Sequence, residues 1–527
     1  MEKKIVPLII VIFFAVASVW PVFKNLGTVG DFGTDGELIV WITNQTIQKV
    51  TGNFREFERG NFSIWSGNIF YPYNNILGYS DLFMISALWA IIPVIVTGNP
   101  AVTAGVGLLV GQILTMIISY FWFKEMSLNR WAAAVSAVAF GWAQVRWHYQ
   151  VHLQMWNMQY FLGSAFCFWK FIKTNNFKWG IGGGILLGLQ AWESLLPVYF
   201  GLSTTLIILI SNNKFLMIKK FQYLKRVFMV ALTAITIMLP VILLYAGVSR
   251  EFGVERSIRE VAHNGLSVDD TWGWFGSIGI IALLILAIIQ ITNHKLQETN
   301  KDLKWLVGLA IFGYVMALGP TLKWGGQTVK LGNMPIPLPY VAAYYTVPGF
   351  KALRTPSRWI WLTGFAVSGM VAIGLSTSPL RRRNNSPLHP SLKLREGNFG
   401  DLFKKGLGVV GCLAVATLGG VSLAKYRVLP SPQEYPEVYK WIKNQPGEIV
   451  LELPRGIEAL EHRRMFYSIW TGKTLINGSS GFNPPEIEIK PDYIIVHLDE
   501  MQDTNSKIQT IGGHVVYTDE NAVVYKL

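Results

Sequence analysis

The feature that most constrains this chain is a series of apolar runs spaced along most of its length. A membrane-spanning helix needs roughly 20 mostly apolar residues. Hydrophobic residues make up 51% of the chain and charged residues 15%, whereas soluble domains carry about 25% charged residues. We therefore predict an α-helical polytopic membrane protein. The predicted spans are residues 5–23, 101–123, 131–145, 156–172, 179–192, 195–210, 227–245, 272–291, 305–318, 359–375 and 407–424.

The charges of the connectors predict an orientation. Lys and Arg concentrate in alternate connectors, and connectors of that kind face the cytoplasm. The net charge of +14 then reflects cytoplasmic Lys and Arg, and we expect no nucleic-acid partner. The prediction is a multi-pass cell-membrane protein with about eleven spans, an uncleaved cytoplasmic N-terminus and an extracytoplasmic C-terminus. The basic connectors are 124–130, 170–178, 214–226, 294–304 and 381–405; those poorer in positive charge are 25–80, 146–154, 247–270 and 323–358.

One apolar run, 82–96, does not fit this alternation as a span. If it crossed the membrane, every later basic connector would move outside while the basic N-terminus stayed inside. We predict that it forms a juxtamembrane or re-entrant helix within an outer loop of residues 25–100. Residues 38–50 and 54–64 of the same loop have the amphipathic pattern of interfacial helices.

The character of the sequence changes after residue 428. Residues 435–444 have the pattern of an amphipathic helix, and three segments predict strands. About a hundred residues are enough for a small α/β domain. We predict a membrane domain at 1–428 and a soluble α/β domain at 429–527 on the outer side. The predicted strand segments are 447–454, 491–498 and 514–527.

Acidic residues gather where the first apolar run gives way to the outer loop: Asp31, Asp35 and Glu37. A carboxylate costs little at the water edge of a membrane and much at mid-depth. Such groups can bind a cation, hold a sugar hydroxyl or accept its proton. They also suit a polar turn that ends a helix. A further carboxylate, Asp81, ends the segment NIFYPYNNILGYSD.

Two other outer connectors carry histidines and cations. RWHYQVHLQ contains His148 and His152, and GFKALRTPSRW contains Lys351, Arg354 and Arg358. The histidine spacing suits a metal on a helix, but no carboxylate lies in that segment, so we expect hydrogen bonding rather than zinc. Arg and Lys can hold a lipid phosphate, although at a membrane edge they also bind headgroups without any further role.

These groups together suit transfer of a sugar from a phospholipid carrier. The reaction builds positive charge at the sugar carbon and negative charge on the departing phosphate, and carboxylates and cations stabilise both. Aromatic residues of the outer loop offer ring faces to the sugar. We predict catalytic roles for Asp35, Asp31 and Asp81, substrate binding by Glu37, His148, His152, Lys351, Arg354 and Arg358, and no metal ligands.

The order of the motifs resembles a family of bacterial polytopic proteins of the GT-C glycosyltransferase superfamily that carry a soluble C-terminal tail. TDGELIVWI resembles the first-loop motif of that family, and NIFYPYNNILGYSDLF its second acidic element. VHLQMWNMQYF resembles a histidine element that enters a span, and VPGFKALRTPSRW an element with paired arginines. The resemblance extends along almost the whole chain.

The resemblance implies a GT-C fold and a polyprenyl-phosphate-linked sugar donor. It implies inverting transfer on the outer face of the membrane to a glycan, lipid or protein acceptor. Asp35 matches the position of the catalytic base, and Asp81 the second acidic position. The usual Gly-Asp-Pro start reads Thr-Asp-Gly here, so Asp31 remains an alternative base. By the same resemblance His152 matches the family histidine, and Arg354 and Arg358 match the arginine pair.

Two alternatives to a glycosyltransferase remain open. A transporter or flippase of lipid-linked sugars would place ionisable groups at mid-depth and carry internal repeats, whereas the charges here gather at span ends. A non-catalytic scaffold would scatter the acidic and basic elements in space. No cofactor is certain, and oxygen ligands would suit Mg or Mn if a divalent cation is needed.

Overall fold

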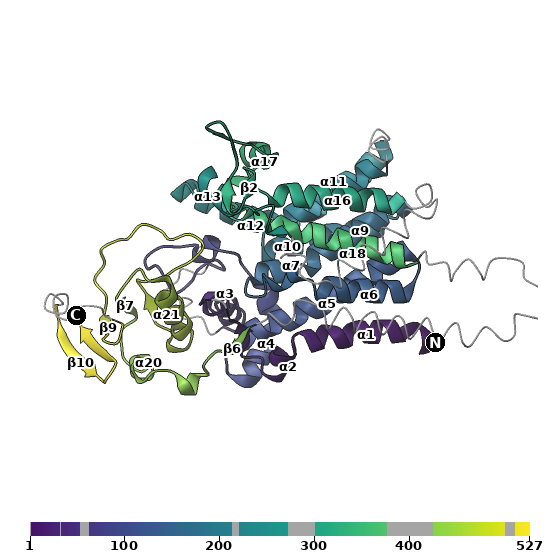
Figure 1. Ribbon diagram of the computed structural model, residues 1–527. Helices are drawn as coiled ribbons and strands as arrows, with labels where there is room; N and C mark the ends of the chain where they lie inside the picture. The colour runs from purple at the N-terminus through teal and green to yellow at the C-terminus, as the bar shows by residue number, and fades with distance from the viewer. Residues whose placement is uncertain are drawn as a thin grey trace, which may run out of the picture.

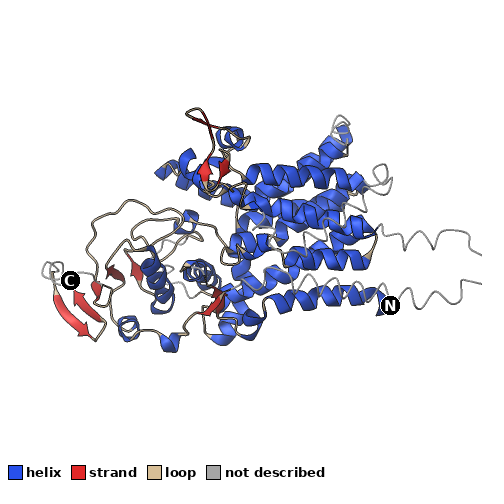
Figure 2. Ribbon diagram, in the orientation of Figure 1, coloured by secondary structure: helices blue, strands red, loops and turns tan. Residues whose placement is uncertain are grey.

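The computed structural model describes residues 2–31, 33–52, 63–212, 221–271, 301–376, 425–500 and 512–527. A bundle of long helices occupies one end of the molecule, and the C-terminal strands and helices occupy the other (Figure 1). The N-terminus lies at the end of the bundle away from the C-terminal part. Helices dominate the bundle, and the strands gather mainly in the C-terminal part (Figure 2).

The long helices form where the sequence predicted spans. Three described helical segments have the length and hydropathy to cross a membrane: Val102–Ser127, Leu224–Phe252 and Pro356–Ser376. Those findings do not establish the count of about eleven spans, and predicted spans 272–291 and 407–424 lie outside the described residues. The long helices are α1 (Glu2–Ser18), α5 (Val102–Ser127), α6 (Arg130–Gly141), α9 (Gln159–Thr174), α10 (Phe177–Glu193), α11 (Leu196–Ser211), α12 (Phe221–Phe252), α16 (Lys301–Ala317) and α18 (Ile360–Ser376).

The bundle is packed by aromatic rings inside and presents apolar side chains outside. Trp122 of α5 stacks on Trp305 of α16 and contacts Phe365 of α18. On α12, Phe228 and Leu243 are each 62% exposed. Exposed apolar surface of this extent is costly in water and suits contact with lipid. The bundle is therefore organised as expected for helices in a bilayer.

Shorter elements connect the helices and cover the end of the bundle that faces the C-terminal part. A helix is confirmed at 38–50, within α3, and 82–96 is a helix, α4; the interfacial position of the first stays a prediction. The predicted helix 54–64 lies almost entirely outside the described residues. The shorter elements are α2 (Trp20–Lys24), β1 (Thr28–Gly30), α3 (Asp35–Val50), α4 (Met84–Thr97), α7 (Gln144–Trp147), α8 (Leu153–Trp156), α13 (Ile258–His263), β2 (Lys323–Trp324), β3 (Gln327–Thr328), β4 (Lys330–Leu331), β5 (Met334–Pro335) and α17 (Tyr340–Thr346).

The C-terminal part, residues 425–527, contains a five-stranded sheet in the order β10-β11-β9-β7-β8. Strand β7 pairs parallel to β8 and β9, and β11 pairs antiparallel to β9 and β10. The predicted helix and strands are confirmed, while the boundary at residue 428 stays a prediction. The elements are β6 (Tyr426–Val428), α20 (Glu437–Lys443), β7 (Ile449–Leu453), α21 (Glu458–Thr471), β8 (Thr474–Leu475), β9 (Tyr493–His497), β10 (His514–Thr518) and β11 (Ala522–Lys526).

The first loop and the C-terminal part share backbone hydrogen bonds. Strand β1 pairs antiparallel with β6. The loop segment 68–71 lies along β8: the amide of Leu475 donates to the carbonyl of Asn68 at 2.8 Å, and the amide of Tyr71 donates to the carbonyl of Leu475 at 3.1 Å. Helix α3 packs against α21 (Figure 1). The C-terminal part is therefore seated on the loop that carries the predicted catalytic residues.

Candidate active site

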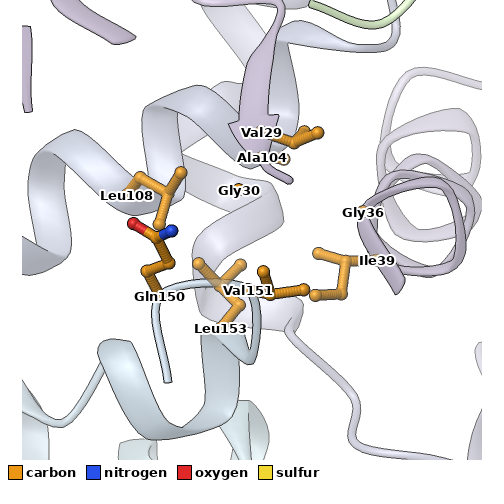
Figure 3. A pocket seen from close by; sticks show the side chains of 9 residues that line it. All are labelled: Val29, Gly30, Gly36, Ile39, Ala104, Leu108, Gln150, Val151 and Leu153. Carbon is orange, nitrogen blue, oxygen red and sulfur yellow. The ribbon is translucent and has the colours of Figure 1, made fainter. Parts of the chain in front are cut away.

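Gly30 lets the first loop approach the connector that carries the histidines, and Gly36 lets α3 approach β1. A Cβ added to Gly30 would lie 2.7 Å from Val151, and one added to Gly36 would lie 2.9 Å from Val29. Val29, Gly36 and Val151 line a cavity of about 10 Å³ between β1, α3 and α5 (Figure 3). Room for about one water means that these segments pack almost without a gap, which fixes Asp35 relative to the neighbouring His152.

Asp35 and His152 meet at this junction. Asp35 is the first residue of α3, and its Oδ2 lies 3.9 Å from Nε2 of His152. The side chain of Asp35 is 37% exposed, and that of His152 is 25% exposed. The carboxylate is thus held by a packed backbone but open to solvent on one side, as an acceptor of a substrate proton must be.

The charges around Asp35 come from several segments. Burial raises the pKa of Asp35, and the carboxylates of Glu458 and Glu37 raise it further, whereas the charges of Arg358 and Arg354 lower it. Burial, helped by the charge of Arg358, lowers the pKa of His152 to about 3. The imidazole of His152 is therefore neutral at pH 7 and can both donate and accept a hydrogen bond.

The charge of Arg358 acts on both predicted acidic positions. Burial raises the pKa of Asp81, and the charge of Arg358 lowers it, as it does for Asp35. Next to Arg358, the hydroxyl groups of Ser357 and Tyr149 lie 3.2 Å apart. This contact joins the arginine segment to the histidine segment. The Nε of Arg358 is buried and has no hydrogen-bond partner among the described residues, so this guanidinium retains capacity for a ligand.

The C-terminal part contributes two side chains that the sequence analysis did not single out. Helix α21 begins at Glu458, and one ligand atom of each of Asp35, Glu458 and His462 lies within 4.8 Å of the others. The hydroxyl of Thr34 lies 3.0 Å from Nδ1 of His462. Glu458 and His462 share one face of α21 because they are four residues apart. That spacing was the available signal, but nothing in the sequence links it to the first loop.

The other first-loop carboxylates face a different partner. Both oxygens of Glu37 accept hydrogen bonds from Arg427 of β6, one of them at 2.8 Å. The Nε of Arg427 lies 3.7 Å from Oδ1 of Asp31. Glu37 is only 4% exposed. Glu37 and Asp31 therefore attach β6 to the first loop, and the geometry favours Asp35 over Asp31 as the group that faces a substrate.

The remaining predicted binding residues lie at the edge of the cluster. Arg354 is 63% exposed, and its Nε lies 3.4 Å from Oε1 of Glu260. Lys351 pairs with Glu255 at 3.0 Å, and both side chains are exposed. The ring of His148 is exposed and lies edge-on to Tyr149, with 5.0 Å between the centroids. Of these three, Arg354 acts on Asp35 through its charge.

Comparison with known proteins identifies the architecture. No family model matches the sequence, and no curated protein matches it. The structure is similar to the solved structure of the arabinofuranosyltransferase AftD from Mycobacteria, with a TM-score of 0.56 and 11% sequence identity. The chain therefore shares the fold of that structure. The match covers 98% of this chain and 39% of AftD, so the chain spans about two fifths of the length of that protein. The resemblance predicted from the sequence is supported at the level of the fold.

Proposed function

We propose that this protein is a membrane glycosyltransferase that moves a sugar from a polyprenyl-phosphate donor to an acceptor hydroxyl. The GT-C fold and the apolar helices support a membrane glycosyltransferase. One observation carries the proposal. Asp35 of the first loop lies 3.9 Å from His152 of the histidine connector, and the charge of Arg358, from the arginine segment, acts on Asp35. In this reading the reaction takes place at the extracytoplasmic face, with the N-terminus in the cytoplasm.

The proposed reaction is a single displacement. Asp35 accepts the proton of the acceptor hydroxyl, and the hydroxyl oxygen forms a bond to the anomeric carbon from the side opposite the phosphate. The bond between that carbon and the phosphate oxygen breaks, and its electron pair leaves with the phosphate. Arg358, supported by Arg354, stabilises the charge on the departing phosphate. Neutral His152 holds a hydroxyl of the sugar or of the acceptor, and Asp81 binds the donor sugar. The sugar product has inverted configuration.

The test is sugar transfer by the purified full chain in lipid nanodiscs, with polyprenyl-phosphate-linked pentoses and hexoses as donors. We expect Asp35→Asn to lower the rate by about 10²–10⁴, the usual contribution of a general base, without loss of folded protein. The matched control is Asp31→Asn, which removes a neighbouring carboxylate whose partner is Arg427. We expect the control to keep most of the activity.

Full transfer by Asp35→Asn would overturn the assignment of the base. If the wild type is active, and Asp31→Asn loses transfer while Asp35→Asn keeps it, then Asp31 is the base in place of Asp35. Movement of the lipid-linked donor across a proteoliposome membrane, with no glycosidic bond formed, would replace the proposed transferase with a transporter.

A further inference from the structure

The junction between the membrane domain and the C-terminal part contains a set of side chains that matches a metal centre. Asp35 comes from the start of α3, and Glu458 and His462 come from the first turns of α21. Their ligand atoms lie within 4.8 Å of one another. Two ligands on one ion, each at about 2.1 Å, stand up to roughly 4.2 Å apart. Small side-chain rotations are therefore enough to bring all three onto a single ion.

The imidazole of His462 supplies an independent indication. His462 is only 1% exposed, and its Nε2 is buried without a hydrogen-bond partner among the described residues. Buried polar atoms are normally satisfied, so an exception calls for a missing partner. The other ring nitrogen, Nδ1, lies 3.0 Å from the hydroxyl of Thr34. With Nδ1–H donating to that hydroxyl, Nε2 carries the free lone pair, as in metal sites whose second shell fixes the histidine tautomer.

The surrounding charges leave the site suited to a cation. Two carboxylates within 4.8 Å of each other repel unless a positive charge is shared between them. Glu37 adds negative charge but is engaged by Arg427. The charges of Arg358 and Arg354 also lower the pKa of Asp35. Both arginines belong to the arginine segment of the membrane domain, and not to α21. Glu458 is exposed, which leaves a path for an ion from solvent.

We propose that Asp35, Glu458 and His462 form a binding site for a divalent transition-metal ion, Mn²⁺ or Zn²⁺. One imidazole nitrogen with two carboxylate oxygens suits these ions better than Mg²⁺ or Ca²⁺, which prefer oxygen alone. Three protein ligands also leave coordination positions open, as in catalytic sites. The ion joins α21 to the start of α3. A carboxylate has two oxygens, so Asp35 can bind the ion through one and face a substrate through the other.

The experiment measures metal binding directly, so that its outcome is separate from that of the transfer assay. Full-length protein, freed of affinity tag and stripped of metal, is titrated with Mn²⁺ and with Zn²⁺ by calorimetry, and bound Mn²⁺ is examined by pulsed electron paramagnetic resonance. We expect one ion per chain and a ¹⁴N coupling from the imidazole. Glu458→Gln and His462→Gln should each weaken binding at least tenfold, and His462→Gln should abolish the ¹⁴N coupling. Thr34→Val, which removes the second-shell partner, should weaken binding about tenfold.

The matched control is Glu437→Gln, which alters an exposed carboxylate of the C-terminal part that pairs with Lys440, lies outside the ligand set, and should bind the ion as the wild type does. Glu458 is exposed, so Glu458→Gln keeps the test informative even if the variant of buried His462 fails to fold. The proposal is overturned if the wild type binds neither ion at one per chain. It is equally overturned if Glu458→Gln binds with unchanged affinity or if the bound Mn²⁺ shows no ¹⁴N coupling.

Discussion

Asp35 and Glu452 are two carboxylates in contrasting environments. Burial and the nearby Glu458 raise the pKa of Asp35. Burial also acts to raise the pKa of Glu452, but the hydrogen bond and charge of His497, the charge of Arg464 and the hydroxyl of Tyr439 together lower it. The side chain of Glu452 is 2% exposed, whereas that of Asp35 is 37% exposed. One carboxylate is enclosed by partners, and the other is left open.

The partners of Glu452 explain its role in the C-terminal part. Its Oε2 accepts a hydrogen bond from the hydroxyl of Tyr439 at 2.7 Å and lies 2.7 Å from Nε2 of His497. Arg464 of α21 lies 3.7 Å away and also contacts Glu500 at 2.7 Å. The network ties β7 to β9, α20 and α21. It thereby fixes the helix that places Glu458 and His462 beside Asp35, so one carboxylate maintains the scaffold that the other depends on.

The largest effect on stability should come from Glu452→Gln. The change leaves buried Arg464 without its partner on β7, and breaking a buried pair costs about 3–5 kcal/mol. We expect the lower end, about 3 kcal/mol, because Glu461 and Glu500 still face Arg464. Hydrogen exchange of the β7 and β9 amides in the full chain should speed up about 100-fold. Asp35→Asn should leave these amides unchanged; equal acceleration in both variants would remove the contrast between the two carboxylates.

A smaller effect is expected from pH, with opposite signs for the two carboxylates. A lowered pKa in the folded state means that the contribution of Glu452 is complete above its ordinary pKa of 4.5 and is lost as the pH falls through the folded value. A raised pKa means that ionised Asp35 destabilises the fold, and acid relieves this cost. Protection of the β7 amides in the wild type should therefore decline below about pH 4.5 toward that of Glu452→Gln. If the protection of the β7 amides differs between the wild type and Glu452→Gln by the same amount from pH 7 to pH 3, the stabilising role of ionised Glu452 is contradicted.

Sequence patterns were enough to predict most of the architecture. Long apolar runs gave the long helices, and short apolar runs rich in Ile and Val gave strands β7 and β9, because both patterns report burial that local sequence already determines. The motif resemblance also selected Asp35 and His152, which lie 3.9 Å apart, and Arg358, whose charge acts on Asp35.

Other features depended on packing between distant segments and could not be read from local patterns. NIFYP was interpreted as part of an acidic element, yet residues 68–71 extend the edge of the C-terminal sheet. Glu37 was assigned to substrate binding, but its carboxylate is engaged by Arg427. Glu458 and His462 were missed because their spacing on α21 gains meaning only when α21 packs against α3. In each case the role of the residue depends on which segments pack against each other, and that packing is determined only by the assembled fold.

The central claim is that the start of α3 and the first turns of α21 form one site. The most direct measurement is cross-linking in intact membranes, with cysteines at the accessible positions 35 and 458 in a chain whose native cysteines are replaced, and a short reagent that carries two thiol-reactive groups. The control pair is His514 and Lys526, which are exposed partners across β10 and β11. The account predicts efficient intramolecular linkage of both pairs. Linkage of the control pair alone, with no product between positions 35 and 458, would contradict it.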